Sequence, residues 1–340
     1  MEKVVVAGAG FAGIQAALSL GRKGFDVEII DKNSEHIYTP GLIDLVRGRC
    51  SQDDLAINTG SLFGDTSVDF FEEEIIDFRP EEKIVVGEEK HGYDYLVLAL
   101  GGEPILPDSF EDVILPYNSS EAEKLRNLEG EVAVIGSGYT GIEYACELGD
   151  KGLNVTVYDM ETRPVKNFSE EVSEKVLEVL YSKDIKFKGG KEIERIEESE
   201  VFYDGGSEEF DHVVANIGVV PDSLLGEAFG NLKTNRGLSA ANYENVFVLG
   251  DCNNSNRKTA HDAMAEAKIV AENIGKKDYE ELVPADIFEP GSLVSMGDTG
   301  LYIRGKRVLE SRLFRYAKDI VRKGYILNLK RQSWMLKNLM

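Results

Sequence analysis

The chain has 340 residues, of which 42% are hydrophobic and 34 are glycines, a composition typical of a globular α/β protein with two or three domains. Its formal net charge of −23 argues against nucleic acid as the main partner, because phosphate binding needs clustered lysine and arginine. The three cysteines form no close pair, so we expect no metal centre, no local redox disulfide and a reducing compartment.

The first residues lead directly into an apolar run, so we expect no signal peptide. No run approaches the roughly 18 apolar residues that a membrane span requires. We therefore expect a cytoplasmic protein that is soluble or lies on the inner face of the cell membrane.

A glycine-rich turn follows the first apolar run and precedes a helical pattern. It contains Gly8, Gly10 and Gly13, and the next apolar run ends at Asp31, 23 residues after the first glycine. Such glycines allow a tight turn and a close backbone approach to a pyrophosphate, and the helix N-terminus offers free N–H groups. The acid accepts hydrogen bonds from adenosine ribose hydroxyls. We call residues 4–31 the first cradle and predict that it binds a dinucleotide.

The stretch over 68–102 comes next. Its alternating apolar runs and turn residues predict a small β-meander that returns to a buried strand, "YLVLAL", which ends at Gly101.

The glycine-rich design then begins again, 128 residues after its first copy. Residues 132–159, the second cradle, contain Gly136, Gly138 and Gly141 and end at Asp159, again 23 residues after the first glycine. In a single copy the glycines could merely close a strand–helix corner, but two copies in register favour two nucleotide sites. Asp159 would also repel a 2′-phosphate, so it favours NAD over NADP.

The remaining patterns alternate between helix and strand. In chain order they predict a helix over 170–183, short strands up to 222, a buried strand over 245–251, a helix over 259–274 and a hairpin over 291–305. The simplest architecture is an α/β fold with two Rossmann-like dinucleotide-binding domains, the second inserted in the first, and a small C-terminal region. We expect the first domain over 1–107 and 231–285, the second over 108–230 and the C-terminal region over 286–340.

The C-terminal tail, residues 311–340, has the opposite charge to the rest of the chain. It carries eight Lys or Arg against one acid, a charge of about +7, which leaves about −30 elsewhere. Apolar residues recur in it at helical spacing, and Gly324 is expected to break the helix in two. A basic amphipathic helix can lie on an anionic membrane. The alternatives are a helix that packs on the body of the protein or on a partner in a homodimer.

Taken together, these motifs resemble the two-dinucleotide-binding flavoproteins, which include the disulfide reductases. Over nearly the full length the chain is most similar to the type II NADH dehydrogenases, which are NADH:quinone oxidoreductases of membrane surfaces. The matching segments are "HIYTPGLIDLVRG", "YDYLVLALGG", "GSGYTGIEYACEL", "VVANIGVVPD", "VFVLGDC", "TAHDAMAEA" and "GSLVSMGD".

This resemblance implies an FAD/NAD(P)-binding fold in which the first cradle holds FAD and the second holds NADH. Asp31 would then bind the adenosine ribose of FAD and Asp251 its ribitol. Hydride would pass between two cofactors placed face to face. The candidate cofactor-binding residues are Gly8, Gly10, Ala12, Gly13, Asp31, Lys32, Pro40, Gly101, Gly250 and Asp251 for FAD, and Gly136, Gly138, Thr140, Gly141, Asp159, Gly218 and Pro221 for NADH.

Glu143 is the first candidate catalytic residue. The first cradle has Gln15 at the equivalent position, so only the second carries an anion there. The resemblance places Glu143 beside the nicotinamide and the flavin, where it would stabilise the positive charge that develops as NADH becomes NAD⁺. The alternative is a first-turn glutamate that the helix dipole favours.

The sequence motifs identify the electron acceptor less clearly than the two cofactors. Disulfide reductases carry a close cysteine pair that is missing here, and we expect Cys50, Cys146 and Cys252 to be buried structural thiols. Where the family usually shows two glutamines, this chain has His261 and Glu266, either of which could hydrogen-bond a quinone or simply contact the flavin or solvent. The prediction is therefore an NADH dehydrogenase that reduces a quinone. The alternatives are a soluble reductase of a ferredoxin- or rubredoxin-like carrier, or a redox-sensing protein that binds NADH and FAD.

Overall fold

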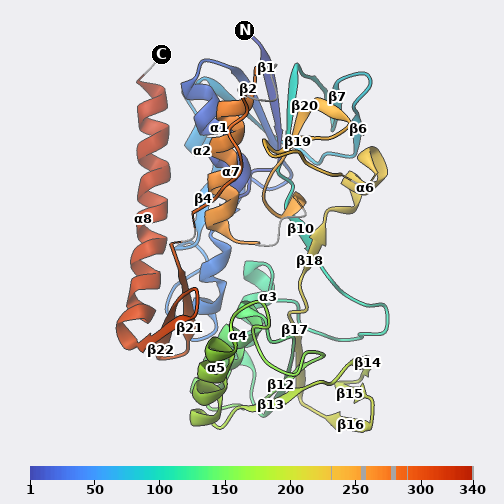
Figure 1. Cartoon of the computed structure of the whole chain (residues 1–340), viewed down its shortest axis with the longest axis vertical. Helices are drawn as coiled ribbons and strands as arrows, with labels where there is room; N and C mark the ends of the chain where they lie inside the picture. The colour runs from blue at the N-terminus through green and yellow to red at the C-terminus, as the bar shows by residue number, and fades with distance from the viewer. Residues whose placement is uncertain (231, 254–257, 277–280, 289, 339–340) are drawn as a thin grey trace.

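The structure is a computed structural model that describes residues 1–230, 232–253, 258–276, 281–288 and 290–338. Two parallel sheets lie towards opposite ends of the molecule, and a long C-terminal helix lies beside the first of them (Figure 1). The last two residues of the predicted tail, 339 and 340, lie outside the described residues.

The first sheet carries the first cradle and has six strands in the order β19-β20-β9-β1-β2-β5. Its neighbouring strands run parallel, except that β19 is antiparallel to β20. The strands are β1 (Lys3–Ala7), β2 (Asp26–Asp31), β5 (Val68–Glu72), β9 (Tyr95–Leu98), β19 (Ser239–Ala240) and β20 (Tyr243–Val248). Successive apolar residues of β1 enter two different cores, because side chains alternate between the faces of a strand and this sheet is covered on both.

Helices cover one face of the first sheet, and a β-meander covers the other. The helical layer consists of α1 (Phe11–Arg22), α7 (Ala260–Asn273) and part of α8 (Arg312–Lys337). The opposite layer consists of β6 (Asp77–Arg79), β7 (Ile84–Val86), β8 (Lys90–Gly92) and α6 (Ser223–Phe229). The meander predicted between the two cradles is therefore present.

The second sheet carries the second cradle and has four parallel strands in the order β13-β12-β11-β17. They are β11 (Glu131–Ile135), β12 (Asn154–Asp159), β13 (Lys186–Gly189) and β17 (His212–Ala215). One face packs on α4 (Tyr139–Lys151) and α5 (Glu170–Ser182). The other packs on the antiparallel strands β14 (Ile193–Glu197), β15 (Glu200–Tyr203) and β16 (Gly206–Glu209).

A short antiparallel ladder joins the two sheets. It consists of β10 (Gly102–Pro104) and β18 (Val219–Pro221), and Figure 1 shows it between the two halves of the molecule. All four strands of the second sheet come after β9 and before β19 in the chain. This order confirms the predicted α/β class, with one dinucleotide-binding fold inserted in another.

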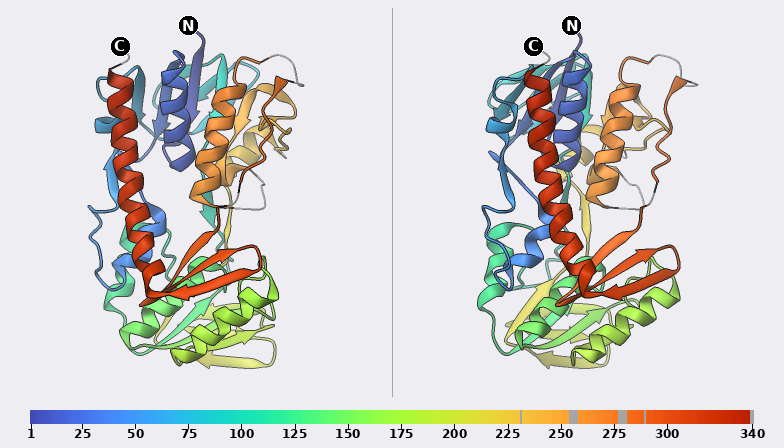
Figure 2. Two further views of the ribbon diagram at one scale, coloured as in Figure 1. Left: turned by 60° about the vertical axis from the view of Figure 1, so that its left-hand side comes forward. Right: turned by 90° about the vertical axis from the view of Figure 1, so that its left-hand side faces the viewer.

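The C-terminal region packs on both halves. Strands β21 (Ser292–Met296), β22 (Thr299–Arg304) and β23 (Arg307–Ser311) form a sheet whose apolar side chains join the core around α4. Figure 2 shows α8 starting at this sheet and then running alongside α1. The remaining short elements are β3 (Glu35–Ile37), a 3₁₀ helix (Thr39–Leu45), β4 (Ala56–Asn58), α2 (Thr59–Phe63), α3 (Ser119–Lys124) and two further 3₁₀ turns (Leu125–Asn127 and Gly250–Cys252).

Helix α8 is continuous and packs one of its faces on the body of the protein. It continues without a break through Gly324, so the predicted interruption is wrong; its packing against the body outweighs the weak helix propensity of one glycine. One face of the helix places Tyr325, Leu329 and Leu336 in the core of the first sheet. The opposite face leaves several apolar side chains exposed. These are Leu313, Tyr316, Ile320, Leu327 and Trp334, which we call the α8 stripe.

Candidate functional site

The first glycine of each cradle is required by the fold itself. Gly8 and Gly136 have φ angles of +103° and +100°, a region that L side chains rarely adopt. A Cβ on Gly8 would lie 2.3 Å from the carbonyl oxygen of Ala99, and one on Gly136 would lie 2.3 Å from that of Asn216. These glycines let the turn press against the neighbouring strand.

The middle glycine of each cradle is different, because it faces open space. A Cβ on Gly10 or Gly138 would meet nothing within 4 Å. Both residues are the N-caps of their helices, α1 and α4; no side chain caps either helix, and neither helix has an acid in its first turn. Open space beside free N–H groups and a positive helix end is the arrangement that a pyrophosphate needs. Both cradles therefore fit a dinucleotide.

The acid of each cradle also holds the glycine turn. Asp31 Oδ2 accepts a hydrogen bond of 2.7 Å from the Ala9 amide, and Asp159 Oδ2 accepts one of 2.6 Å from the Ser137 amide. The spacing of the motif predicted the position of these acids but not this second role. Lys32, next to Asp31, makes an exposed ion pair of 3.6 Å with Glu74.

The Gly250-Asp251 turn lies against the first cradle, as predicted. A Cβ on Gly250 would lie 3.4 Å from the Cβ of Ala12 in the first turn of α1. The Asp251 carboxylate is partly buried, burial raises its pKa, and no residue in the described part of the chain donates a hydrogen bond to it. It is therefore available to the hydroxyls of a ligand bound along the first cradle.

The two residues predicted to meet the electron acceptor occupy different environments. Glu266 is buried and accepts hydrogen bonds from the Gly250 amide at 2.7 Å and from Asn253 Nδ2 at 3.3 Å. Burial raises the pKa of Glu266, which these bonds oppose. Glu266 therefore holds the Gly250-Asp251 turn, whereas His261 is exposed at the start of α7, 3.4 Å from Asp262.

The ladder between the two halves brings together predicted residues from both cofactor sites. Gly102, next to Gly101, pairs with Pro221 across β10 and β18. The Gly218 carbonyl accepts hydrogen bonds from the Ile105 amide at 3.0 Å and from the Tyr117 hydroxyl at 3.1 Å. The loops that the resemblance places beside FAD and NADH are therefore neighbours.

All three cysteines are buried and free, as expected. Burial raises the pKa of Cys50 to about 11 and that of Cys252 to about 12, so both remain thiols. The Cys252 sulfur lies 3.2 Å from the Gly101 amide and helps to join the β20 turn to β10.

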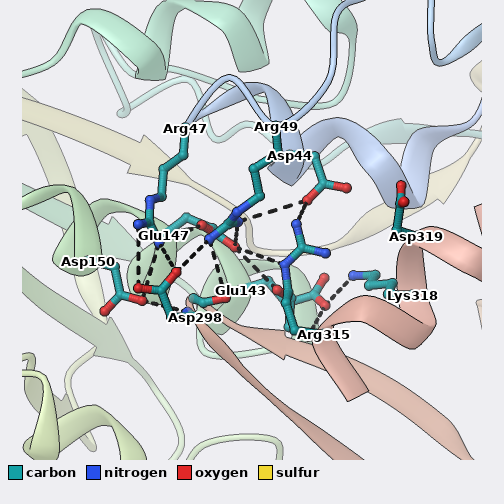
Figure 3. Close-up of polar contacts among 12 residues, drawn as sticks. Asp44, Arg47, Arg49, Glu143, Glu147, Asp150, Asp298, Arg315, Lys318 and Asp319 are labelled. Carbon is teal, nitrogen blue, oxygen red and sulfur yellow. Dashed lines mark hydrogen bonds and ion pairs between the residues drawn. The ribbon is translucent and has the colours of Figure 1, made fainter. Parts of the chain in front are cut away.

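Glu143 is buried within a cluster of charges that the sequence did not predict (Figure 3). Its Oε1 accepts a hydrogen bond of 2.6 Å from the Ser295 amide of β21 and forms an ion pair with Lys318 of α8. Three segments far apart in the chain thus meet at this carboxylate. Glu143 also lies outside the first turn of α4, so the alternative of a first-turn glutamate favoured by the helix dipole does not hold.

The rest of this cluster surrounds Glu147, one turn further along α4. Glu147 is fully buried, lies 2.5 Å from Arg49, and accepts a hydrogen bond of 3.2 Å from Ser295 Oγ. Burial raises the pKa of Glu147, and the Arg49 hydrogen bond opposes the shift. Figure 3 shows Arg315 from α8 between this pair and Asp44, with which it forms an ion pair. The charge cluster comprises Asp44, Arg47, Arg49, Glu143, Glu147, Asp150, Asp298, Arg315 and Lys318.

A buried histidine supports the first cradle from the side of α8. His36 Nδ1 lies 3.2 Å from the Ala9 carbonyl, and its Nε2 lies 2.9 Å from the Tyr325 hydroxyl. Burial lowers the pKa of His36 to about 4, although the bond to Ala9 opposes the shift. A neutral ring with its proton on Nδ1 satisfies both contacts, because it donates to Ala9 and accepts from Tyr325.

His36→Gln is expected to reduce the acid sensitivity of the fold. As the pH falls from about 6.5 towards 4, the unfolded chain takes up a proton that buried His36 does not, so acid favours unfolding. Between pH 7 and pH 4.5 this difference lowers the free energy of unfolding by roughly 2 kcal/mol. Urea unfolding at the two pH values should show a loss that is smaller by this amount in the variant. An identical loss in both proteins would contradict a neutral His36.

Comparison with known proteins places this geometry in a family. The model of the pyridine nucleotide-disulphide oxidoreductase family matches residues 2–267. A type II NADH:quinone oxidoreductase of Staphylococcus saprophyticus is 26% identical over an alignment of 300 residues, and the match covers 74% of this chain and 74% of that protein.

Two solved structures show the same fold. NDH2 from Plasmodium falciparum, in complex with NADH, superposes with a TM-score of 0.83 at 15% identity, over 99% of this chain and 97% of that one. A ferredoxin reductase from Rhodopseudomonas palustris gives a TM-score of 0.78 at 23% identity, over 89% and 82%. The family match covers both cradles and the ladder between them. The chain therefore belongs to the pyridine nucleotide-disulphide oxidoreductase family and is an oxidoreductase.

Proposed function

We propose that this oxidoreductase is an FAD-dependent NADH dehydrogenase that transfers hydride from NADH to FAD and then reduces a quinone by two electrons. The observation that carries the proposal is the repeated cradle. At the same point of both copies, the middle glycine faces open space beside an uncapped helix N-terminus. Two such sites, linked by one short ladder, suit an electron donor and an electron acceptor.

The chain's own residues would bind and orient the two cofactors. The free N–H groups of α1 and α4 would hold the two pyrophosphates, and Asp251 would accept hydrogen bonds from the ribitol of FAD. Bound FAD supplies the hydride and electron chemistry, which amino-acid side chains lack. The loop of Gly218 and Pro221, fixed against Gly102, would set the nicotinamide half of NADH towards the first cradle.

Glu143 would act on the nicotinamide through its charge. It lies in the second cradle, four residues after the start of α4, and its carboxylate forms an ion pair with Lys318. A carboxylate there would favour the positive ring of NAD⁺ over neutral NADH. This role follows the family resemblance.

The quinone as acceptor is supported by the Staphylococcus relative, whose name includes that substrate, and by the α8 stripe. A second candidate is a reductase of an acidic ferredoxin- or rubredoxin-like carrier. The exposed basic residues of α8, such as Lys330 and Arg331, favour it because they could meet such a carrier.

Anaerobic stopped-flow experiments test the proposal. The purified protein should be yellow, NADH should bleach the flavin absorbance within seconds, and a soluble quinone such as menadione should restore it quickly. Faster reoxidation by a ferredoxin or rubredoxin than by a quinone would favour the second candidate. A reduced flavin that persists with every acceptor would contradict both and favour a redox sensor.

The α8 stripe is the proposed contact with the inner face of the membrane. No helix in the described part of the chain is long and apolar enough to span a membrane. The stripe is strongly exposed, with Ile320 and Leu327 at 70% and 69%, and basic residues of the same helix flank it. Apolar residues beside positive charge suit the headgroup region of an anionic bilayer.

Leu327→Glu combined with Ile320→Glu is expected to reduce flotation with anionic liposomes at least about fivefold, because each glutamate opposes burial in the headgroup region. Neutral liposomes should float little of either protein. Deletion of the tail is a poor test, since Tyr325, Leu329 and Leu336 belong to the core. Lys306→Glu, an exposed charge change outside α8, is the control. Equal flotation of the double variant and wild type would contradict this contact.

A further inference from the structure

We propose that Asn216 hydrogen-bonds the nicotinamide-bearing half of NADH and so helps to position the reacting ring. The proposal rests on the proposed function, because it assumes that the second cradle binds NADH. Asn216 follows β17 and lies in none of the predicted sets of site residues.

The side chain of Asn216 is buried but has no partner. Asn216 is 7% exposed, and neither its Oδ1 nor its Nδ2 forms a hydrogen bond with the residues that the structure describes. A buried amide without a partner is costly, and such groups in native proteins usually have a partner that the structure lacks. Since this amide offers both a donor and an acceptor, the missing partner should offer both as well.

The backbone of Asn216 belongs to the second cradle. Its carbonyl oxygen is the atom that a Cβ on Gly136 would meet at 2.3 Å. Its Cβ lies 3.7 Å from the point where a Cβ on Gly141 would stand, in the first turn of α4. Asn216 is therefore packed between the glycine turn and the helix start.

The order of strands indicates which half of the dinucleotide Asn216 would meet. In the sheet β13-β12-β11-β17, Asp159 ends β12 and Asn216 follows β17, on opposite sides of the cradle strand β11. A dinucleotide crosses the carboxyl edge of such a sheet, with its adenosine ribose at the acid and its pyrophosphate at the glycine turn. The nicotinamide half then extends to the side of β17. Its ribose hydroxyls and its carboxamide both donate and accept hydrogen bonds.

The first cradle provides an internal comparison. There, the residue whose carbonyl meets the first glycine is Ala99, so the repeat places alanine where the second cradle has Asn216. Ala99 is buried and the first cradle is fully formed around it. The fold therefore accepts alanine at this position. The fold alone does not require the amide of Asn216, which leaves it available for the ligand of the second cradle.

Asn216→Ala tests the proposal by calorimetric titration of the purified full-length protein with NAD⁺ and with ADP. We expect the Kd for NAD⁺ to rise about tenfold, as the loss of one or two hydrogen bonds implies, while the Kd for ADP stays the same. The Tm without ligand should stay the same or rise, because the variant removes an unpaired buried amide. Asn154→Ala is the matched control: this asparagine begins β12 at the opposite edge of the same sheet, is exposed, and should change neither affinity.

Two results would overturn the role of Asn216. One is an unchanged Kd for NAD⁺ in Asn216→Ala while wild type binds both ligands, which would leave the proposed function intact. The other is a lower Tm together with an equal loss of NAD⁺ and ADP affinity, which would mean that the amide supports the fold. If wild type bound neither ligand, the proposed function would fail and this inference would fail with it.

Discussion

Gly10→Val is expected to give a folded protein that lacks FAD, and Gly138→Val a yellow protein that NADH does not reduce. Both glycines have extended backbone, with φ angles of −76° and −65°, which valine adopts readily. The Cβ of the new side chain would meet nothing within 4 Å, so the fold should tolerate it. It would, however, occupy the place of a pyrophosphate and weaken binding by at least about 100-fold, or about 3 kcal/mol.

The measurements are the flavin absorbance of the purified variants and the rate of its bleaching by NADH. Circular dichroism should show folded protein in both cases. Gly13→Ala is the contrasting control, because its Cβ would lie 1.8 Å from the Gly8 carbonyl oxygen and should prevent folding. A colourless Gly138→Val together with a yellow Gly10→Val would mean that the two cofactors are assigned to the wrong cradles.

The sequence predicted the architecture because the decisive signals are local. Strand, glycine turn, helix and acid lie within 28 residues in each cradle, and their spacing repeats. Both copies fold as predicted, and even the hydrogen bonds of Asp31 and Asp159 to the turns are the same. A single glycine-rich motif is weak evidence for this fold, and its repetition at the same spacing made the prediction reliable.

The charge cluster could not be predicted in the same way. Lys318 lies 175 residues from Glu143, and Arg315 lies 271 residues from Asp44. In the sequence the tail is a basic amphipathic segment, and the spacing of its residues does not tell which basic side chains turn inwards. Only the position of α8 across both halves separates the buried Arg315 and the largely buried Lys318 from the exposed residues of the same helix.

For Glu266, the motif did not reveal which groups its carboxylate contacts. The resemblance aligned it with a family position near the acceptor, and its type, a carboxylate, allowed that role. In the structure its two oxygens are used by Gly250 and Asn253. The backbone amide of Gly250 needs an acceptor in this tight turn, and the Glu266 carboxylate is that acceptor. A sequence motif does not show which side chain accepts the hydrogen bond of a backbone amide in a turn.

Glu143→Gln and Lys318→Met are each expected to lower the free energy of unfolding by about 3 kcal/mol, because each leaves a largely buried charge without its partner. Glutamine at position 143 can still accept the hydrogen bond from the Ser295 amide, so the loss reports the charge. The free energy of unfolding of the double variant should fall by about 2 kcal/mol less than the sum of the two single losses, and this difference is the coupling. Urea unfolding of the four proteins measures this cycle.

The exposed pair of Glu121 and Lys124 on α3 is the control for the cycle. Glu121→Gln with Lys124→Met should show a coupling below about 1 kcal/mol, since solvent screens surface ion pairs. A similar coupling in both cycles would contradict the buried character of the Glu143 pair.

The same four proteins separate a catalytic from a structural role for Glu143. If its charge stabilises the nicotinamide as hydride leaves, Glu143→Gln should slow flavin reduction by NADH at least about tenfold, and adding Lys318→Met should not restore the rate. If Glu143 only anchors α8 to α4, Lys318→Met alone should slow the reduction as much as Glu143→Gln, because both variants break the same ion pair. Stability alone cannot distinguish these cases, because both predict the same coupling. The rate can, since only a charge that acts on the substrate makes Glu143→Gln much slower than Lys318→Met.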